Sequence, residues 1–205
     1  MTVAFLHTVL GLPPVFNQLA DELLPRVERF HIVDESLLGV TRKVGSLTPV
    51  TRRRVQGYLE SATAAGADLV VVTCSSIGPA VDESTVRALR IDEPMAEAAV
   101  RIGPRVGVLA TLATTLEPTA ELVARHGGDV RAHLCEGAFD ALQAGDRDRH
   151  DELVREGLRQ IDAEVDVVVL AQASMARVTD ALSASVPILS SPRLGIERVA
   201  QLVGG

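Results

Sequence analysis

The sequence predicts an α/β fold of two pseudo-symmetric, doubly wound parallel-sheet lobes. Three observations support this prediction. Short apolar runs alternate with helical stretches along all 205 residues. Residues 70–72 and 167–170 are continuously apolar, which is typical of central strands covered by helices on both faces. Both runs follow an aspartate and lead into small polar residues, at positions 98 apart. In such a fold we expect the active site in the cleft between the lobes.

Each element follows from local signals. Pro13 and Pro14 suit the start of the first helix, and Gly66 and Gly127 suit the ends of two others. Residues 39–49 lack periodicity and are expected to form a mobile loop near the site. The helical stretch 137–164 should break at Gly145. Strands are expected at 2–8, 29–34, 68–74, 105–110, 129–134, 166–171 and 186–190, and helices at 13–24, 49–65, 80–89, 94–102, 115–126, 137–164 and 192–203.

An internal repeat relates the two halves of the chain. At an offset of 98, Asp68, Ser76 and Pro94 match Asp166, Ser174 and Pro192; at an offset of 103, Val3, Leu6 and Thr8 match Val106, Leu109 and Thr111. The order of elements repeats as well, which favours a duplication. We therefore expect lobes at 1–102 and 103–205, with the C-terminal helix a candidate to pack back on the first lobe.

Composition excludes several classes of function. A net charge of −7 without a basic block argues against nucleic acid or an anionic membrane as partner. Two cysteines are too few for a disulfide scaffold, and no Cys/His spacing suggests a metal site. No glycine loop of the Walker or dinucleotide type is present, so we expect no cofactor. No apolar run could span a bilayer, and the first residues lack a basic signal region, so the expected location is the cytoplasm.

Polar side chains gather where the predicted strands end. Because the carboxyl ends of parallel strands meet at one edge of a sheet, these residues should line a ligand site. Hydroxyl groups and helix N-termini suit a carboxylate, so a small carboxylate or amino acid is the expected ligand. The candidates are His7, Thr8, Asp34, Cys74, Ser75, Ser76, Thr111, Thr114, Gln172 and Ser174.

Cys74 is the main candidate for chemistry. It stands between a buried strand and a turn, where the dipole of the following helix favours a thiolate. The alternative is a buried cysteine that acts as a small hydrophobe, which is the reading favoured for Cys135. His7 is either a charged imidazole that lowers the thiol pKa or a hydrogen-bonded core residue. Asp34 is either a general acid or amine-binding group, or the cap of the next helix.

With these residues in view, the chain resembles the aspartate/glutamate/hydantoin racemase superfamily over nearly its full length. The motifs are VVVTCSS at 70–76, GVLAT at 107–111 followed by Thr114 and Thr115, and VLAQASM at 169–175. The resemblance implies two α/β lobes with the active site between them. It also implies cofactor-independent chemistry at the carbon next to a carboxylate or carbonyl, and a homodimer.

In the family, two cysteines, one in each lobe, remove and return the α-proton on opposite faces of the substrate. By motif, Cys74 matches the first cysteine, and Ser75, Ser76 and Thr111 match positions that hold the carboxylate. The second cysteine position is occupied by Gln172, which cannot act as an acid or base near neutral pH. His7 and Thr8 replace an aspartate and hydroxyl residue often found after the first strand.

Three hypotheses therefore stay open. The first is a racemase or epimerase-like isomerase whose second base is His7, Asp34 or Cys135. The second is a one-base decarboxylase, lyase or cis–trans isomerase that uses Cys74 alone. The third is a carboxylate-binding protein that has kept the pocket without turnover.

Overall fold

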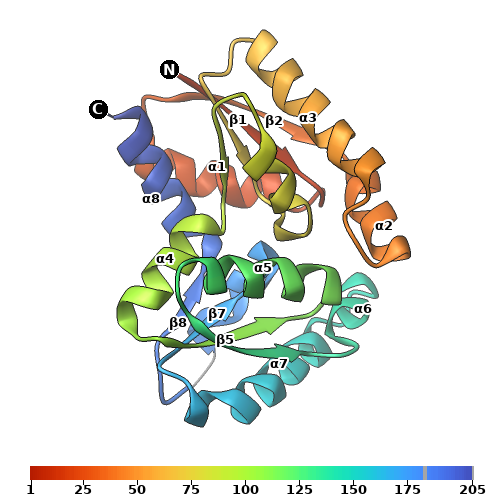
Figure 1. Cartoon of the computed structure of the whole chain (residues 1–205), viewed down its shortest axis with the longest axis vertical. Coiled ribbons are helices and arrows are strands. Elements are labelled where there is room, and N and C mark those ends of the chain that lie inside the picture. The colour runs from red at the N-terminus through yellow and green to blue at the C-terminus, as the bar shows by residue number, and fades with distance from the viewer. Residues whose placement is uncertain (182–183, 205) are drawn as a thin grey trace. The chain divides into compact units, whose positions relative to one another are not determined.

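The computed structural model describes residues 1–181 and 184–204 and confirms the predicted α/β class (Figure 1). The chain forms two compact units, one of residues Met1–Glu93 with the segment from Pro192 onward, the other of Pro94–Ser191. The sequence analysis divided the chain at 102/103 instead. The helix that starts at Glu93 thus falls almost wholly in the second unit, and the C-terminal helix in the first. None of the described helices is both long and apolar enough to cross a membrane.

The first unit is a four-stranded parallel sheet in the order β2-β1-β3-β4 with helices packed around it (Figure 1). Its core includes Leu6, Leu37, Val55 and Leu59, which are all fully buried. The elements are β1 Thr2–His7, α1 Leu12–Leu23, β2 Glu28–Val33, α2 Glu35–Val44, α3 Pro49–Ala64, β3 Leu69–Val72, the 3-10 segment η1 Ser75–Glu83, β4 Ala88–Arg90 and α8 Ser191–Val203.

The second unit repeats this plan with the sheet order β6-β5-β7-β8. Its core includes Leu109, Val154, Leu158 and Leu170. The elements are α4 Glu93–Ile102, β5 Arg105–Ala110, α5 Ala113–Arg125, β6 Asp129–Leu134, α6 Ala138–Gln143, α7 Arg147–Ile161, η2 Asp162–Glu164, β7 Val167–Leu170, η3 Ala173–Ala181 and β8 Ile188–Ser190.

Two equivalent hydrogen bonds support the predicted duplication. The Thr2 N–H donates to the Asp68 carboxylate over 2.7 Å, and the Arg105 N–H donates to the Asp166 carboxylate over 2.9 Å. Each bond joins the first residue of a strand to the aspartate that precedes the neighbouring strand in the sheet, β1 to β3 in the first unit and β5 to β7 in the second. β3 and β7 are themselves buried at all four positions, as their apolar sequences predicted. The 98-residue offset therefore relates equivalent structural positions in the two units.

Two predictions about individual elements were wrong. Residues 39–49 were expected to be a loop, but most of this stretch lies in α2, which Asp34 caps at its start and the left-handed Gly45 ends. Residues 80–89 were expected to be a helix, but they form the end of η1 and the start of β4, which pairs with β3. The predicted break at Gly145 is confirmed, since α6 and α7 separate there.

Gly157 in α7 tests how tightly this helix packs on the second sheet, and Gly57 in α3 of the first unit is its matched control. A Cβ at Gly157 in α7 would lie 2.6 Å from the Cys135 sulfur and 3.0 Å from Leu109, whereas a Cβ at Gly57 in α3 would meet nothing within 4 Å. We expect Gly157→Ala to lower the free energy of unfolding by about 1–3 kcal/mol through overpacking. Gly57→Ala should raise it by up to about 1 kcal/mol through helix propensity. Urea unfolding measures both, and equal effects of the two substitutions would contradict this packing.

Candidate active site

Cys74 stands at the carboxyl end of β3 and opens η1. Its backbone is extended (φ −123°, ψ 115°), and the Ile77 N–H donates to its carbonyl over 3.2 Å. The backbone N–H groups of Ser76 and Ile77 also lie near enough to the sulfur to lower the thiol pKa. The residue is partly exposed by surface area, although its sulfur lies deep among neighbouring atoms. Burial raises the pKa of the thiol, and this effect outweighs the hydrogen bonds that lower it. Cys74 is therefore a protonated thiol at neutral pH in the free protein.

Thr8 lies beside Cys74 because β1 and β3 are paired in parallel. Leu6 pairs with Val72, so both strands reach the same edge, and the Thr73 N–H donates to the Leu6 carbonyl over 3.0 Å. The Thr8 side chain is buried, and its hydroxyl is directed to the Cys74 sulfur, which lowers the thiol pKa. Among the described residues this hydroxyl has no partner other than that sulfur.

His7 is buried within a chain of hydrogen bonds. Its Nδ1 lies 2.8 Å from the Thr73 hydroxyl and its Nε2 lies 2.8 Å from His31 Nδ1. His31 Nε2 in turn lies 3.1 Å from the Asn17 side-chain oxygen, which also accepts from Arg29 Nε. Because that oxygen can only accept, His31 must donate to it. His7 must then donate to His31, and its Nδ1 accepts from Thr73, whose one hydroxyl proton is shared with the Leu6 carbonyl 3.1 Å away.

The pKa of His7 is lowered to about 3, first by burial and then by the neighbouring His31. The ring is thus uncharged at neutral pH. The prediction of a charged His7 that lowers the thiol pKa is therefore wrong, because burial and the neighbouring His31 both disfavour the imidazolium form. The alternative reading, a hydrogen-bonded core histidine, describes the observed contacts. His7 supports the neighbouring ends of β1 and β3, which Thr8 and Thr73 follow.

Gln172 occupies the place in the second unit that Cys74 occupies in the first. It directly precedes η3, as Cys74 directly precedes η1. Its amide forms two hydrogen bonds with Thr111: the Thr111 N–H donates to Oε1 over 2.9 Å, and Nε2 donates to the Thr111 hydroxyl over 2.7 Å. Thr111 is in turn the counterpart of Thr8. Each unit therefore joins a threonine after its first strand to the residue after its third, with a thiol in one and an amide in the other.

Asp34 serves a local structural role in the first unit. It caps α2 by accepting from the Ser36 N–H over 2.9 Å, and it also accepts from Tyr58 over 2.8 Å and from Arg54 over 2.5 Å. Hydrogen bonds from Ser36 and Tyr58, with the charge of Arg54, outweigh partial burial and lower the pKa of its carboxyl group. Asp34 is therefore ionised at neutral pH and a poor general acid.

The remaining predicted residues divide between the two sheet edges. Ser75 and Ser76 are buried in the first turn of η1, next to Cys74. Thr114 lies in the first turn of α5, where its hydroxyl is buried and has no hydrogen-bond partner among the described residues. Ser174 is partly exposed at the start of η3. In the part of the chain that the structure describes, neither Cys74 nor His7 joins a cluster of three or more metal-ligating side chains.

Cys135 follows β6 and is buried. Burial raises the pKa of its thiol to about 12, so it is neither a nucleophile nor a base at neutral pH. This agrees with its reading as a packed thiol. Sequence reasoning did not include three further polar residues of this unit, Thr73, His31 and Arg90, among the site candidates. A polar residue ending an apolar strand was the available signal for Thr73 and Arg90, whereas the pairing of His31 with His7 depends on strand register.

Comparison with known proteins assigns the family. The Asp/Glu/hydantoin racemase family profile matches residues 16–199. Similar solved structures include a glutamate racemase from Bacillus anthracis (16% identity, TM-score 0.71, covering 99% of this chain and 81% of that one). They also include an allantoin racemase from Klebsiella pneumoniae (17%, 0.73, 100% and 88%) and an aspartate racemase from Picrophilus torridus (13%, 0.72, 98% and 94%). A search of curated proteins finds no match.

The fold and the strand-end residues thus define an α/β protein of the racemase type. The chain belongs to the Asp/Glu/hydantoin racemase family, since the profile spans most of its length. Membership confirms the resemblance seen in the sequence and places the chain among isomerases.

The buried His7 predicts a specific pH dependence of stability. In the unfolded chain a histidine binds a proton below about pH 6.5, whereas the folded protein holds His7 neutral down to about pH 3. Folding is therefore opposed increasingly as the pH falls through this window, by up to about 1.4 kcal/mol per pH unit. We expect urea unfolding between pH 7 and pH 4 to show a shallower loss of stability for His7→Gln than for wild type. Parallel curves for the two proteins would contradict a neutral His7.

Proposed function

We propose that this protein is a cofactor-independent enzyme that moves a proton at the carbon next to a carboxylate, with Cys74 as its acid–base group. The observation that carries the proposal is the setting of Cys74. A thiol at a strand end, facing two N–H groups and the Thr8 hydroxyl, has donors that can stabilise its thiolate. No other cysteine or histidine identified in the sequence analysis combines partial exposure with such donors.

The raised pKa of the Cys74 thiol indicates that the resting group is a proton donor. In the free protein Cys74 carries its proton, so it is ready to donate to a carbanion or enediolate. Removal of an α-proton requires the thiolate, which the N–H groups of Ser76 and Ile77 stabilise. Abstraction then moves the α-proton from carbon to sulfur, while the electron pair of the C–H bond passes to the carboxylate as an enediolate. Return of the proton reverses both changes.

The substrate class is a small carboxylic or amino acid. A carboxylate needs several donors, and the Thr114 hydroxyl in the first turn of α5 is buried without a partner among the described residues. The N-terminus of this helix adds a favourable partial charge. We assign Thr114 as a carboxylate donor. The Thr111 hydroxyl and N–H already bond Gln172, so Thr111 holds the amide rather than the substrate.

Gln172 limits the stereochemical outcome. Inversion requires a proton from the face opposite to Cys74, and an amide held by two hydrogen bonds to Thr111 cannot supply it. His7 and Asp34 are each occupied by structural hydrogen bonds, His7 with Thr73 and His31 and Asp34 with Ser36, Arg54 and Tyr58. Burial keeps the Cys135 thiol protonated, so none of these groups replaces the second thiol readily. We therefore expect exchange of the α-proton with solvent to be faster than inversion.

A second candidate function follows from the protonated thiol. An enzyme that generates an enediolate by loss of CO2 needs only one proton donor, on one face of the intermediate. Cys74 in its resting state meets this requirement without prior loss of a proton. A one-thiol decarboxylase or lyase of a small dicarboxylate is the alternative within the same family. The homodimer and the cytoplasmic location expected from the sequence stay predictions.

The two cysteines provide a matched pair of variants for testing the proposal. The protein is incubated in D2O with a panel of amino acids, hydantoins and dicarboxylates, and deuterium at the α-carbon is followed by NMR. We expect wild type to exchange or decarboxylate at least one member of the panel. Cys74→Ala should lower this rate by at least about 100-fold, the scale of general acid–base catalysis. Cys135→Ala should leave it within about twofold, because the buried thiol stays protonated.

Two outcomes would contradict the proposal. One is undiminished exchange in Cys74→Ala. The other is a panel on which ligands raise the melting temperature of the protein while none is turned over, which would favour the carboxylate-binding hypothesis.

A further inference from the structure

The segment η1 sets the surroundings of the Cys74 sulfur. Cys74 is the residue before η1, and the Ile77 N–H in the first turn donates to its carbonyl over 3.2 Å. The N–H groups of Ser76 and Ile77 also act on the sulfur, where they lower the thiol pKa. A 3-10 segment has weaker internal hydrogen bonds than an α-helix, and Pro79 removes a donor from this one. The position of η1 must therefore be maintained by groups outside it.

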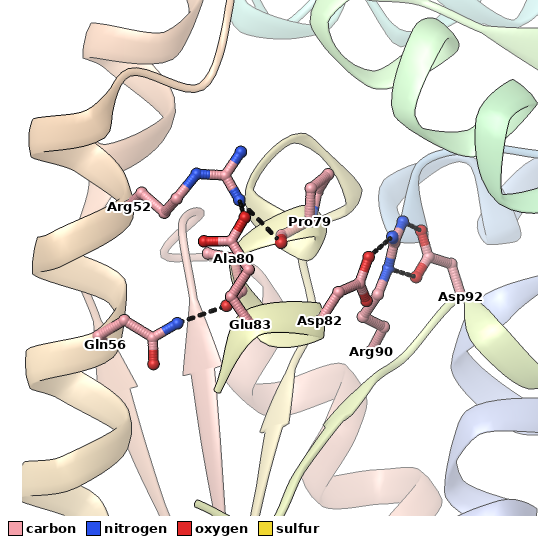
Figure 2. Close-up of polar contacts among 8 residues, drawn as sticks. All are labelled: Arg52, Gln56, Pro79, Ala80, Asp82, Glu83, Arg90 and Asp92. Atoms are coloured by element: carbon pink, nitrogen blue, oxygen red, sulfur yellow. Dashed lines mark hydrogen bonds and ion pairs between the residues drawn. The ribbon is translucent and has the colours of Figure 1, made fainter. Parts of the chain in front are cut away.

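Arg90 holds η1 from the side of β4. Only 2% of its side chain is exposed, although arginine is rarely buried. Its guanidinium donates to both oxygens of the buried Asp92, each over 3.1 Å, and lies 3.3 Å from the carboxylate of Asp82 in η1 (Figure 2). Gly78, also in η1, packs on the same guanidinium, since a Cβ there would lie 2.7 Å from Arg90 Nε. Any side chain at position 78 would require the guanidinium to move.

Helix α3 holds η1 from another side (Figure 2). Arg52 donates to the Pro79 carbonyl over 2.9 Å and to the Glu83 carboxylate over 2.8 Å, and Gln56 donates to the Ala80 carbonyl over 2.5 Å. Both carbonyls belong to η1. Together with the Arg90 contacts, these bonds reach five of its nine residues, all of them after the turn that faces the sulfur.

The second unit does not repeat the arginine. By strand register, Arg90 pairs with Val72 as Ser190 pairs with Leu170, so Ser190 is the counterpart of Arg90. By the same register Pro192 stands where the first unit has Asp92, so the second unit lacks both members of the buried ion pair. The arginine occurs in the unit that carries the thiol, and the serine in the unit that carries Gln172. This difference links Arg90 to the chemistry of Cys74 rather than to the fold that both units share.

A contribution to stability alone does not account for Arg90. Removing a guanidinium and a carboxylate from water costs several kcal/mol per ion, and a buried ion pair is often no more stabilising than apolar residues of similar size. What such a pair can provide is a single, well-defined geometry. Here that geometry includes Gly78 and Asp82, the two residues by which Arg90 touches η1.

We propose that Arg90 is a positioning residue for Cys74: together with Asp92 it holds η1 where the Ser76 and Ile77 N–H groups meet the sulfur. The inference deepens the proposed function, since it concerns the same thiol. It does not depend on turnover, however, because the ionisation of Cys74 can be measured without a substrate.

The test measures the thiol pKa through the pH dependence of iodoacetamide alkylation, with modification at Cys74 quantified by peptide mass spectrometry. The main variant is the double substitution Arg90→Met with Asp92→Asn, which leaves no unpaired buried charge at either position. We expect the Cys74 pKa to rise by about one unit, a roughly tenfold loss of thiolate at a given pH. Arg90→Lys should shift it less, because an ammonium keeps the charge but not the two-pronged geometry.

Arg105→Met is the matched control, since Arg105 also pairs with an aspartate, but in the second unit and at the amino end of β5. It should leave the Cys74 pKa unchanged. If the double variant does not fold, Gly78→Ala replaces it, because the added methyl group must displace the guanidinium and should raise the pKa in the same direction. A folded variant of either kind with the wild-type Cys74 pKa would overturn the proposal. Failure of every substrate to turn over would overturn only the proposed function.

Discussion

The parallel pairing of the first and third strands of each unit is the constraint on which the site depends. In the first unit Leu6 pairs with Val72, so the residues that follow both strands meet at one edge, and Thr8 reaches Cys74. In the second unit the pairing of Leu109 with Leu170 brings Thr111 to Gln172 in the same way. A slip of one residue in either register would turn these side chains to the opposite face of the sheet. The chemistry of both edges thus follows from backbone hydrogen bonds in buried strands.

The duplication makes one difference between the units informative. The family resemblance implies one thiol in each lobe, and here the amide of Gln172 takes the second place while bonding Thr111. The buried His7, the partly buried His31 and the buried Arg90 lie in the sheet of the thiol-bearing unit. Each of these groups is costly to bury, so together they make this edge more polar and more constrained than its counterpart. We interpret the first unit as the chemically active half and the second as a donor of hydrogen bonds.

Much of this arrangement could be predicted from the sequence. The acid, the apolar run and the small polar residues at 68–76 and 166–174 predicted both central strands, the duplication and the equivalence of Cys74 with Gln172. The cap and terminal glycine of α2 were present in the sequence but were outweighed by its weak periodicity. The state of His7 could not be predicted, because it depends on His31 across a strand pair. Arg90 was missed for a similar reason: its place at the end of an apolar strand and the nearby Asp92 are visible in the sequence, but its burial against Gly78 depends on how η1 packs on β4.

The central claim is that the amide at position 172 prevents efficient inversion while Cys74 still transfers a proton. The most direct measurement compares wild type with Gln172→Cys, recording α-proton exchange in D2O and inversion by chiral chromatography in the same samples. The account predicts that the new thiol raises the ratio of inversion to exchange by about tenfold or more, because an acid–base group replaces an amide. Exchange itself should persist in both proteins. A wild-type protein that already inverts its substrate as fast as it exchanges the α-proton would contradict the account.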